Sequence, residues 1–327
     1  MLAKLESVAI SGRLIGKMIL VALLVQILFT TSTDLVLADY EKGNEAFKKH
    51  NYPLAQKEYL KAAENGDVRA QVEVGVMYVT GLSGVINFKE GIRWLKIAAE
   101  QGNATAQINL GNLYRSGAPA TWLSKNKGLT RDPVEAAKWY RLAAEQEKSE
   151  AQFKLGRLYE FGDGVTKNYQ EAYKWYLKSA NQNNAKAQNI LGVMYFQGKG
   201  IPKNTVEAIG WFRRSAEQND MIGQYNFSTF HEKGLGVEKN LDEAFKWLKL
   251  SAEQGYGKAQ AKLGYLYVLA RGTSRDLVRG YMWSALAIQR GEKTSLMNTI
   301  GPALSAEQKA HALAMAEQCK KAKYKGC

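Results

Sequence analysis

The sequence repeats one pattern six times, and this periodicity limits the possible folds more than any other feature. The pattern begins with Ala-Gln or Gly-Gln at residues 70, 106, 151, 187, 223 and 259, so four intervals are 36 residues long and one is 45. A tryptophan occupies the same place in every copy: Trp94, Trp139, Trp175, Trp211, Trp247 and Trp283. Self-similarity at this period predicts a solenoid of stacked units. We expect each repeat tryptophan to fill the space between its own helix pair and the next.

Each unit is predicted to form two helices joined by a glycine-rich turn. In the unit that starts at Ala151, apolar residues recur at helical spacing around Gly156. A glycine inside a helix costs about 1 kcal/mol relative to alanine, so its recurrence predicts that a neighbouring helix crosses closely. The second helix follows an N-cap residue, and five units have a glutamate three positions later, a pattern close to a capping box. These N-caps are Asn87, Asp132, Asn168, Asn204, Asn240 and Asp276.

The order Ala-Gln, Leu-Gly, Tyr, a glycine-rich turn, Glu-Ala, Trp and Ala-Glu-Gln resembles the Sel1-like repeat, a relative of the tetratricopeptide repeat. The resemblance implies an all-α fold, a right-handed αα-solenoid superhelix of antiparallel helix pairs. It also implies a protein-interaction scaffold, often in bacterial envelopes or in signalling. Three positions depart from the pattern: Ser228 replaces the helix glycine, His231 replaces the tyrosine, and Arg279 replaces the glutamate after the N-cap.

The segments outside the six repeats have their own signatures. Residues 1–38 have the basic start, apolar run and small residues of a secretory signal peptide, and an uncleaved membrane anchor is the alternative. Residues 39–69 resemble a degenerate first unit, in which Glu58 occupies the tryptophan position. The six repeats cover residues 70–290, and residues 291–327 are predicted to form a C-terminal cap helix and a basic tail.

Two local features follow from this division. An insertion at about residues 118–131 contains Trp122, which either belongs to a binding loop or covers the neighbouring hairpin. Cys319 and Cys327 are the only cysteines, and in an exported chain an even count favours a disulfide between them. The predicted location is therefore periplasmic or secreted, with no membrane span after cleavage.

Charge and motifs restrict the chemistry. The chain carries a net charge of +14, and removing residues 1–38, with three basic and two acidic residues, leaves +13. Such a balance can attract anionic polysaccharide, whereas export argues against nucleic acid. The three histidines stand in different units, and no metal or cofactor is predicted. A Ser-x-x-Lys string at Ser124 to Lys127 is the one trace of a cell-wall-active enzyme of the β-lactamase or penicillin-binding type.

We therefore predict a non-catalytic scaffold that binds a protein or peptide of the cell envelope in a concave groove. An envelope enzyme and a basic module for anionic glycans are the alternatives. In tetratricopeptide relatives the first helices line the groove, and residues two, six and nine positions after each start point away from the core. The predicted partner-binding residues, including Trp122 of the insertion, are Asn112, Arg115, Trp122, Phe153, Arg157, Asn189 and Tyr225.

Overall fold

The computed structural model describes residues 37–84, 86–117 and 128–327. The fold is all-α, and the chain divides into two compact units, one ending at Gln146 and one starting at Glu147. The predicted signal peptide lies, apart from residues 37 and 38, outside the described residues. Of the helices in the described ranges, none has both the length and the apolar character that crossing a membrane requires.

The first unit consists of sequential antiparallel helices. A helix over residues 37–48 opens it, and the predicted cleavage point before Asp39 falls within this helix. The helices that follow are α2 (Tyr52–Glu64), α3 (Val68–Thr80), α4 (Phe88–Glu100), α5 (Ala104–Ser116) and α6 (Pro133–Glu145). Glu58, in the tryptophan position of the first hairpin, is buried and accepts two hydrogen bonds from Lys61 at 2.9 and 2.8 Å.

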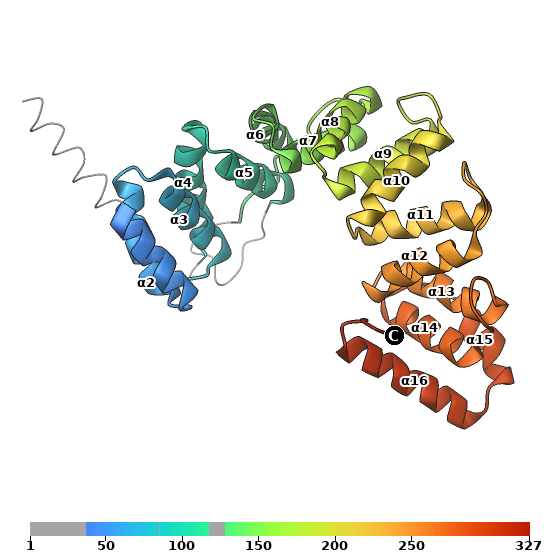
Figure 1. Cartoon of the computed structure of the whole chain (residues 1–327). Helices are drawn as coiled ribbons and strands as arrows, with labels where there is room; N and C mark the ends of the chain where they lie inside the picture. Colours follow the sequence, from blue (N-terminus) through green and yellow to red (C-terminus); the bar gives the residue numbers. More distant parts are fainter. Residues whose placement is uncertain (1–36, 85, 118–127) are drawn as a thin grey trace, which may run out of the picture. The chain divides into compact units, whose positions relative to one another are not determined.

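The second unit continues the same alternation, and Figure 1 shows its helices following one another from green to red. Its repeat helices are α7 (Ser149–Phe161), α8 (Tyr169–Asn181), α9 (Ala185–Gln197), α10 (Thr205–Glu217), α11 (Met221–Lys233), α12 (Leu241–Glu253), α13 (Gly257–Leu269) and α14 (Leu277–Gln289). The end is closed by α15 (Leu296–Ile300), a 3₁₀ turn η1 (Gly301–Ala303) and α16 (Ala306–Lys321). The predicted cap helix is therefore present, and it packs on α14.

The recurring helix glycine marks a close crossing, as predicted. In α7, a Cβ on Gly156 would lie 2.8 Å from the ring of Tyr176 on α8. Gly192 of α9 stands in the same relation to Phe212 of α10, at 2.6 Å. In both pairs the buried partner is the residue directly after the repeat tryptophan, so the crossing of these two helices depends on a large side chain that packs on a glycine.

The N-caps of the six second helices are confirmed. Each predicted Asn or Asp side chain accepts a hydrogen bond from a backbone N–H of the first turn. Most of the glutamates three positions later form an ion pair with a basic residue three positions further along the helix, as Glu171 does with Lys174 at 2.6 Å. A reciprocal capping box forms at Ser305 and Gln308, at the start of α16.

The repeat tryptophans pack differently from the prediction. Trp211 of α10 shares a core cluster with Tyr176 of α8 and Leu191 of α9, so it packs against the preceding repeat and not the next. Trp94, Trp139, Trp211 and Trp283 are buried. Trp175 and Trp247 are only half-buried.

In five of the six repeats, two glutamines form a hydrogen-bond ladder that sequence reasoning missed. The amide of the glutamine at the C-cap of the second helix donates to the side-chain carbonyl of the glutamine in Ala-Gln or Gly-Gln, at 2.6 to 2.8 Å. The pairs are Gln101 with Gln71, Gln146 with Gln107, Gln182 with Gln152, Gln218 with Gln188, and Gln254 with Gln224. Gln188 in turn donates to the carbonyl of Ala180 in the preceding repeat at 3.1 Å. The ladder thus joins consecutive repeats.

Candidate interaction surface

The first helices of successive repeats lie against each other, α3 with α5 and α9 with α11. In the second unit we call the solvent side of α7, α9, α11 and α13 the first-helix face. It comprises Phe153, Arg157, Glu160, Phe196, Tyr225, Thr229, Glu232, Lys262 and Tyr265. The equivalent positions of the first unit are considered separately, because each unit is described by itself.

In the first unit, two predicted binding residues have structural contacts. Asn112 accepts a hydrogen bond from the hydroxyl of Tyr140 at 2.8 Å. Arg115 is half-buried, and its backbone carbonyl accepts from Nε of Arg131 at 3.0 Å. The Asn112 contact therefore orients the tyrosine that packs on Gly111, so Asn112 contributes to the packing of the two helices in its repeat.

On α7, the predicted residues Phe153 and Arg157 belong to the first-helix face. The ring of Phe153 lies 5.7 Å from that of Tyr176, centroid to centroid, and is half-buried. The guanidinium of Arg157 lies 5.4 Å from the ring centroid of Phe161, which is itself exposed. These two side chains leave an aromatic and a cationic group accessible on one turn of helix.

Glu160 connects the face to the core. Its carboxylate accepts a hydrogen bond from the hydroxyl of Tyr176 at 2.7 Å and from Nζ of Lys199 at 3.1 Å. Burial, followed by the charge of Glu160, raises the pKa of Tyr176 far above its ordinary value, so this phenol stays protonated as a donor.

Asn189 differs from the other predicted residues. It is only 6% exposed, and its side-chain oxygen accepts from Nδ2 of Asn226 at 2.8 Å, across α9 and α11. We therefore leave Asn189 out of the first-helix face, because its amide is occupied in joining two first helices.

Several polar and aromatic side chains on the face contact one another around Tyr225. We call Tyr225, Thr229, Glu232, Tyr256 and Lys262 the tyrosine–lysine cluster. Nζ of Lys262 lies 2.6 Å from the carboxylate of Glu232 and donates to the hydroxyl of Thr229 at 2.9 Å. The same ammonium lies 5.3 Å from the ring centroid of Tyr225. The rings of Tyr225 and Tyr256 meet edge to face at 5.4 Å.

Partial burial raises the pKa of the two phenols in this cluster. Burial, then the charges of Glu232 and Glu292, raise the pKa of Tyr225. Burial, then Tyr225 and Glu292, raise the pKa of Tyr256. Both phenols are neutral at physiological pH, and their side chains present hydroxyl groups beside an ion pair.

Residues 118–127 of the insertion lie outside the described residues. They include Trp122, together with Ser124 and Lys127 of the Ser-x-x-Lys string. The predicted roles of this loop therefore stay predictions.

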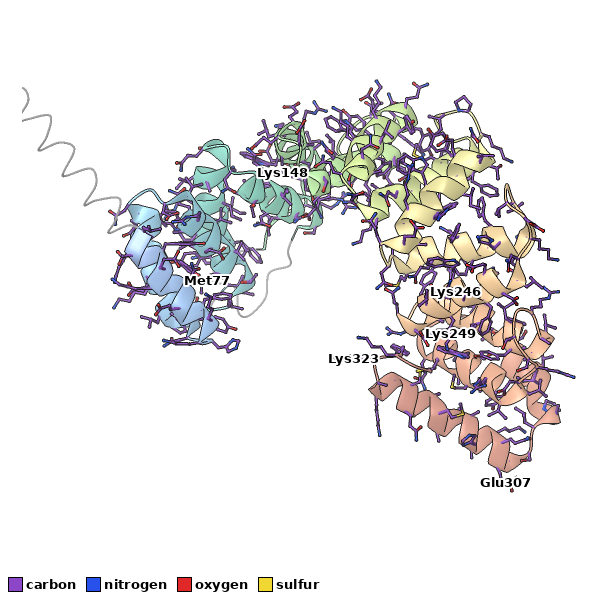
Figure 2. The ribbon with its side chains drawn as sticks, in the orientation of Figure 1. Met77, Lys148, Lys246, Lys249, Glu307 and Lys323 are labelled. Carbon is purple, nitrogen blue, oxygen red and sulfur yellow. A yellow bond between two sulfur atoms is a disulfide. The ribbon has the colours of Figure 1, made fainter. Side chains whose placement is uncertain are left out.

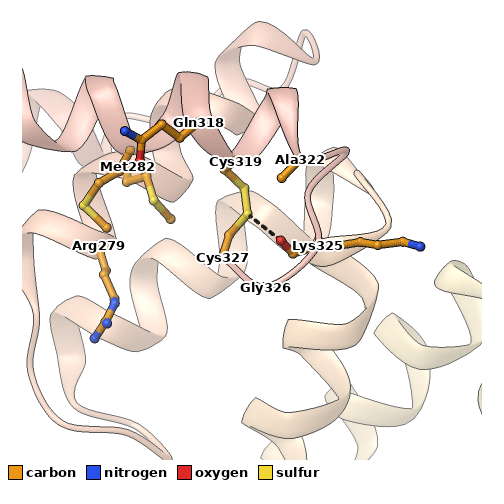
Figure 3. A pocket seen from close by; sticks show the side chains of 9 residues that line it. Arg279, Met282, Gln318, Cys319, Ala322, Lys325, Gly326 and Cys327 are labelled. Carbon is orange, nitrogen blue, oxygen red and sulfur yellow. Dashed lines mark hydrogen bonds between the residues drawn. A yellow bond between two sulfur atoms is a disulfide. The ribbon is translucent and has the colours of Figure 1, made fainter.

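The C-terminal end carries the predicted bond between Cys319 and Cys327. It links α16 to the last residues of the chain, and Figure 3 shows it beside Lys325 and Gly326. A cavity of about 320 Å³ lies here, lined by side chains that include Arg279 and Met282 of α14. The tail is thus held against the cap.

A row of exposed cations forms a second regular feature, which sequence reasoning also missed. One basic residue precedes the N-cap of each second helix in the second unit: Lys167, Lys203, Lys239 and Arg275. The structure gives none of these four an ion pair within the part of the chain that it describes. By contrast, Lys246 and Lys249 of α12, labelled in Figure 2, pair with Glu243 and Glu253. The 36-residue spacing of these four residues is the sequence signal from which the row could have been predicted.

Comparison with known proteins agrees with the repeat pattern. A sequence model of the Sel1 repeat matches residues 36–67, 68–103, 104–148, 149–184, 185–220, 222–256 and 257–292. The segment expected to be a degenerate unit thus matches as a seventh repeat. No curated protein is detectably similar to the chain in sequence.

Two solved structures are similar over most of the chain. One is a protective antigen present in uropathogenic Escherichia coli strains that displays an SLR fold, with 29% identity, a TM-score of 0.74 and 88% of this chain covered. This chain spans 61% of that protein's length. The other is a Sel1 repeat protein from Oxalobacter formigenes, with 31% identity and a TM-score of 0.66, covering 78% of this chain and 99% of that one.

Proposed function

The chain belongs to the Sel1 repeat family, and on that premise we propose that it is a non-catalytic scaffold binding a protein or peptide partner on the first-helix face. The observation that carries this proposal is the tyrosine–lysine cluster. Its side chains are held by one another, so little rotamer freedom remains to be lost when a partner binds. Tyrosine and arginine, both present on this face, are enriched among residues that dominate binding energy.

We infer a location outside the cytoplasm. The Cys319 to Cys327 bond supports this, because disulfides persist in oxidising compartments. The likeness to a protective antigen of Escherichia coli supports it as well. Mass spectrometry of the isolated protein should find an N-terminus near Asp39 and no free thiol. An intact N-terminus in a membrane fraction would support the anchor instead.

Site-specific photocrosslinking in intact cells tests the binding surface. Tyr265 on α13 is 38% exposed on the first-helix face, and Leu250 on α12 is 37% exposed on a second helix. A photoreactive phenylalanine at Tyr265 should give one dominant covalent adduct, and the same residue at Leu250 should not. Adducts from Leu250 with none from Tyr265 would place the partner elsewhere.

A second candidate function rests on the row of unpaired cations. Lys167, Lys203, Lys239 and Arg275 recur at one edge of the second unit and suit an anionic polysaccharide of the envelope. Because exposed charges are screened by salt, such binding should weaken steeply between low and physiological ionic strength.

Binding of polygalacturonate to the full chain distinguishes this candidate. Replacing the four cations together with glutamine should abolish the salt-dependent binding. A matched variant in which four paired cations, Arg93, Lys138, Lys174 and Lys246, are replaced with glutamine should retain most of it. Equal losses of binding in both variants would show that the net charge of the chain, and not the row of cations, causes the binding.

A further inference from the structure

The junction between α10 and α11 differs from the two junctions beside it. In the preceding repeat, Tyr173 of α8 and Tyr195 of α9 fill the equivalent space, with their hydroxyls 2.8 Å apart and their rings at 5.9 Å. In the following repeat, Phe245 of α12 and Tyr267 of α13 meet edge to face at 5.4 Å. Aromatic pairs thus close the junctions on both sides.

Smaller residues occupy these positions between α10 and α11. Ile209 stands where Tyr173 and Phe245 stand, and His231 replaces the tyrosine of the other repeats. A cavity of about 260 Å³ results, lined by Val206, Ile209, Gly210, Arg213, Phe227, His231, Gly236 and Val237. An engineered cavity of about 150 Å³ accepts benzene, so this one has room for a substituted aromatic ring.

The mouth of the cavity is open for an identifiable reason. In four other repeats the residue equivalent to Gly210 is basic and pairs with the glutamate three positions earlier, as Lys174 does with Glu171. A Cβ on Gly210 would have no neighbour within 4 Å. Val206, one turn earlier on the rim, is 69% exposed. The rim therefore presents apolar surface where the other repeats carry a charged side chain.

His231 is the cavity-lining residue whose ring nitrogens have no hydrogen-bond partner among the described residues. Its Nδ1 has almost no accessible surface, so Nε2 is the ring nitrogen that a ligand can reach. The ring packs edge to face on Phe227 at 4.7 Å, and the backbone carbonyl is held by the N–H of Asn240 at 3.0 Å. Burial lowers the pKa of His231, against the opposing charge of Glu243, so the imidazole is neutral at pH 7. A neutral ring nitrogen can either accept or donate a hydrogen bond.

We propose that this cavity binds a tyrosine side chain of a partner protein, with the ring between Val206, Ile209 and Val237 and the phenol hydroxyl bonded to Nε2 of His231. A phenol restores what the neighbouring α8–α9 junction contains, where the hydroxyl of Tyr173 bonds to Tyr195, the residue equivalent to His231. The site lies apart from the first-helix face, so it does not depend on the function proposed above. Arg213 at the rim is paired with Glu217 at 2.8 Å, so the site lacks a free cation in its described lining and favours a neutral ligand.

The probes are p-cresol, the side-chain analogue of tyrosine, and toluene, the analogue of phenylalanine. They are titrated into the full chain with labelled valine and isoleucine methyl groups and followed by NMR. We expect p-cresol to shift the methyl signals of Val206, Ile209 and Val237 and to bind at least about fivefold more tightly than toluene, because only the phenol can form a hydrogen bond with the accessible ring nitrogen of His231. N-acetyl-tyrosinamide should cause the same shifts, since a partner's tyrosine carries its backbone.

Three variants make the test specific. Gly210→Lys restores the repeat pattern and should weaken p-cresol binding more than tenfold without loss of helicity. His231→Phe should keep the cavity apolar and remove the preference for p-cresol over toluene. Lys246→Gly is the matched control on α12, where Phe245 and Tyr267 already fill the junction, and it should create no site. Absence of shifts, equal affinity for both probes, binding unaffected by Gly210→Lys, or p-cresol binding without N-acetyl-tyrosinamide binding would each overturn the proposal.

Discussion

The two sides of the first helices in the second unit follow different rules. The side that meets the second helix is nearly uniform, with Gly156 under Tyr176 and Gly192 under Phe212. The first-helix face changes from repeat to repeat, from Phe153 on α7 to the tyrosine–lysine cluster on α11 and α13. Uniform positions are those whose substitution breaks the packing of the two helices within a repeat. The variable positions are those that a partner can reach.

The largest expected effect separates two tryptophans that occupy the same position in their repeats. Trp283 is fully buried, so Trp283→Ala should lower the free energy of unfolding by about 3 to 5 kcal/mol. Trp175 is half-buried beneath Nζ of Lys178, which lies 4.6 Å from its ring, so Trp175→Ala should cost less than about 2 kcal/mol. Equal losses in denaturant unfolding would show that the repeat position, and not its burial, determines the energy.

Glycine substitutions sharpen the same comparison. Gly156→Ala gains about 1 kcal/mol of helix propensity but places a methyl group 2.8 Å from the Tyr176 ring, and overpacking of this kind costs about 1 to 3 kcal/mol. We expect a net loss of stability. Gly210→Ala meets open space and should be stabilising by up to about 1 kcal/mol. Thermal melting of both variants checks the opposite signs.

The smallest effect is a pH dependence that comes from His231. Its pKa is lowered in the folded state, so between that value and 6.5 the unfolded chain binds more protons than the folded chain. Stability therefore falls as pH drops below 6.5. His231→Phe should lose this contribution, so the melting temperatures of wild type and variant should diverge between pH 7.5 and 5. An identical pH profile would mean that the imidazole is not desolvated.

The sequence allowed the fold to be predicted because its signals are local. Asn168 caps α8 from one residue away, and Gly156 reveals its close crossing by its recurrence alone. The partner of a longer side chain depends on a neighbouring repeat. Asn189 was predicted to bind a partner, yet it is buried by its contact with Asn226, 37 residues later. The pairing of Lys262 with Glu232 could not be predicted for the same reason.

The glutamine ladder shows what closer reading of the periodicity could have found. Glutamines recur 30 residues apart in each regular repeat, and the pairing follows that interval. The last repeat has Arg290 at this place, and the side-chain oxygen of Gln260 is buried without a partner in the described chain. Among the six repeats from Ala70 to Gln289, the last one lacks the second glutamine, and its first glutamine is left with a buried oxygen that is unpaired by any described residue.

We infer that the residues that hold the repeats together are distinct from those of the first-helix face. The most direct test compares melting and partner capture in the same variants. Once the partner crosslinked through Tyr265 is identified, Tyr225→Ala and Lys262→Met are measured beside Trp283→Ala. We predict that the two face variants keep their melting temperature within a few degrees and bind the partner about five- to thirtyfold more weakly. Trp283→Ala should melt much earlier but, below its midpoint, bind with unchanged affinity. Unchanged binding by both face variants, or weakened binding that follows the loss of stability, would contradict the account.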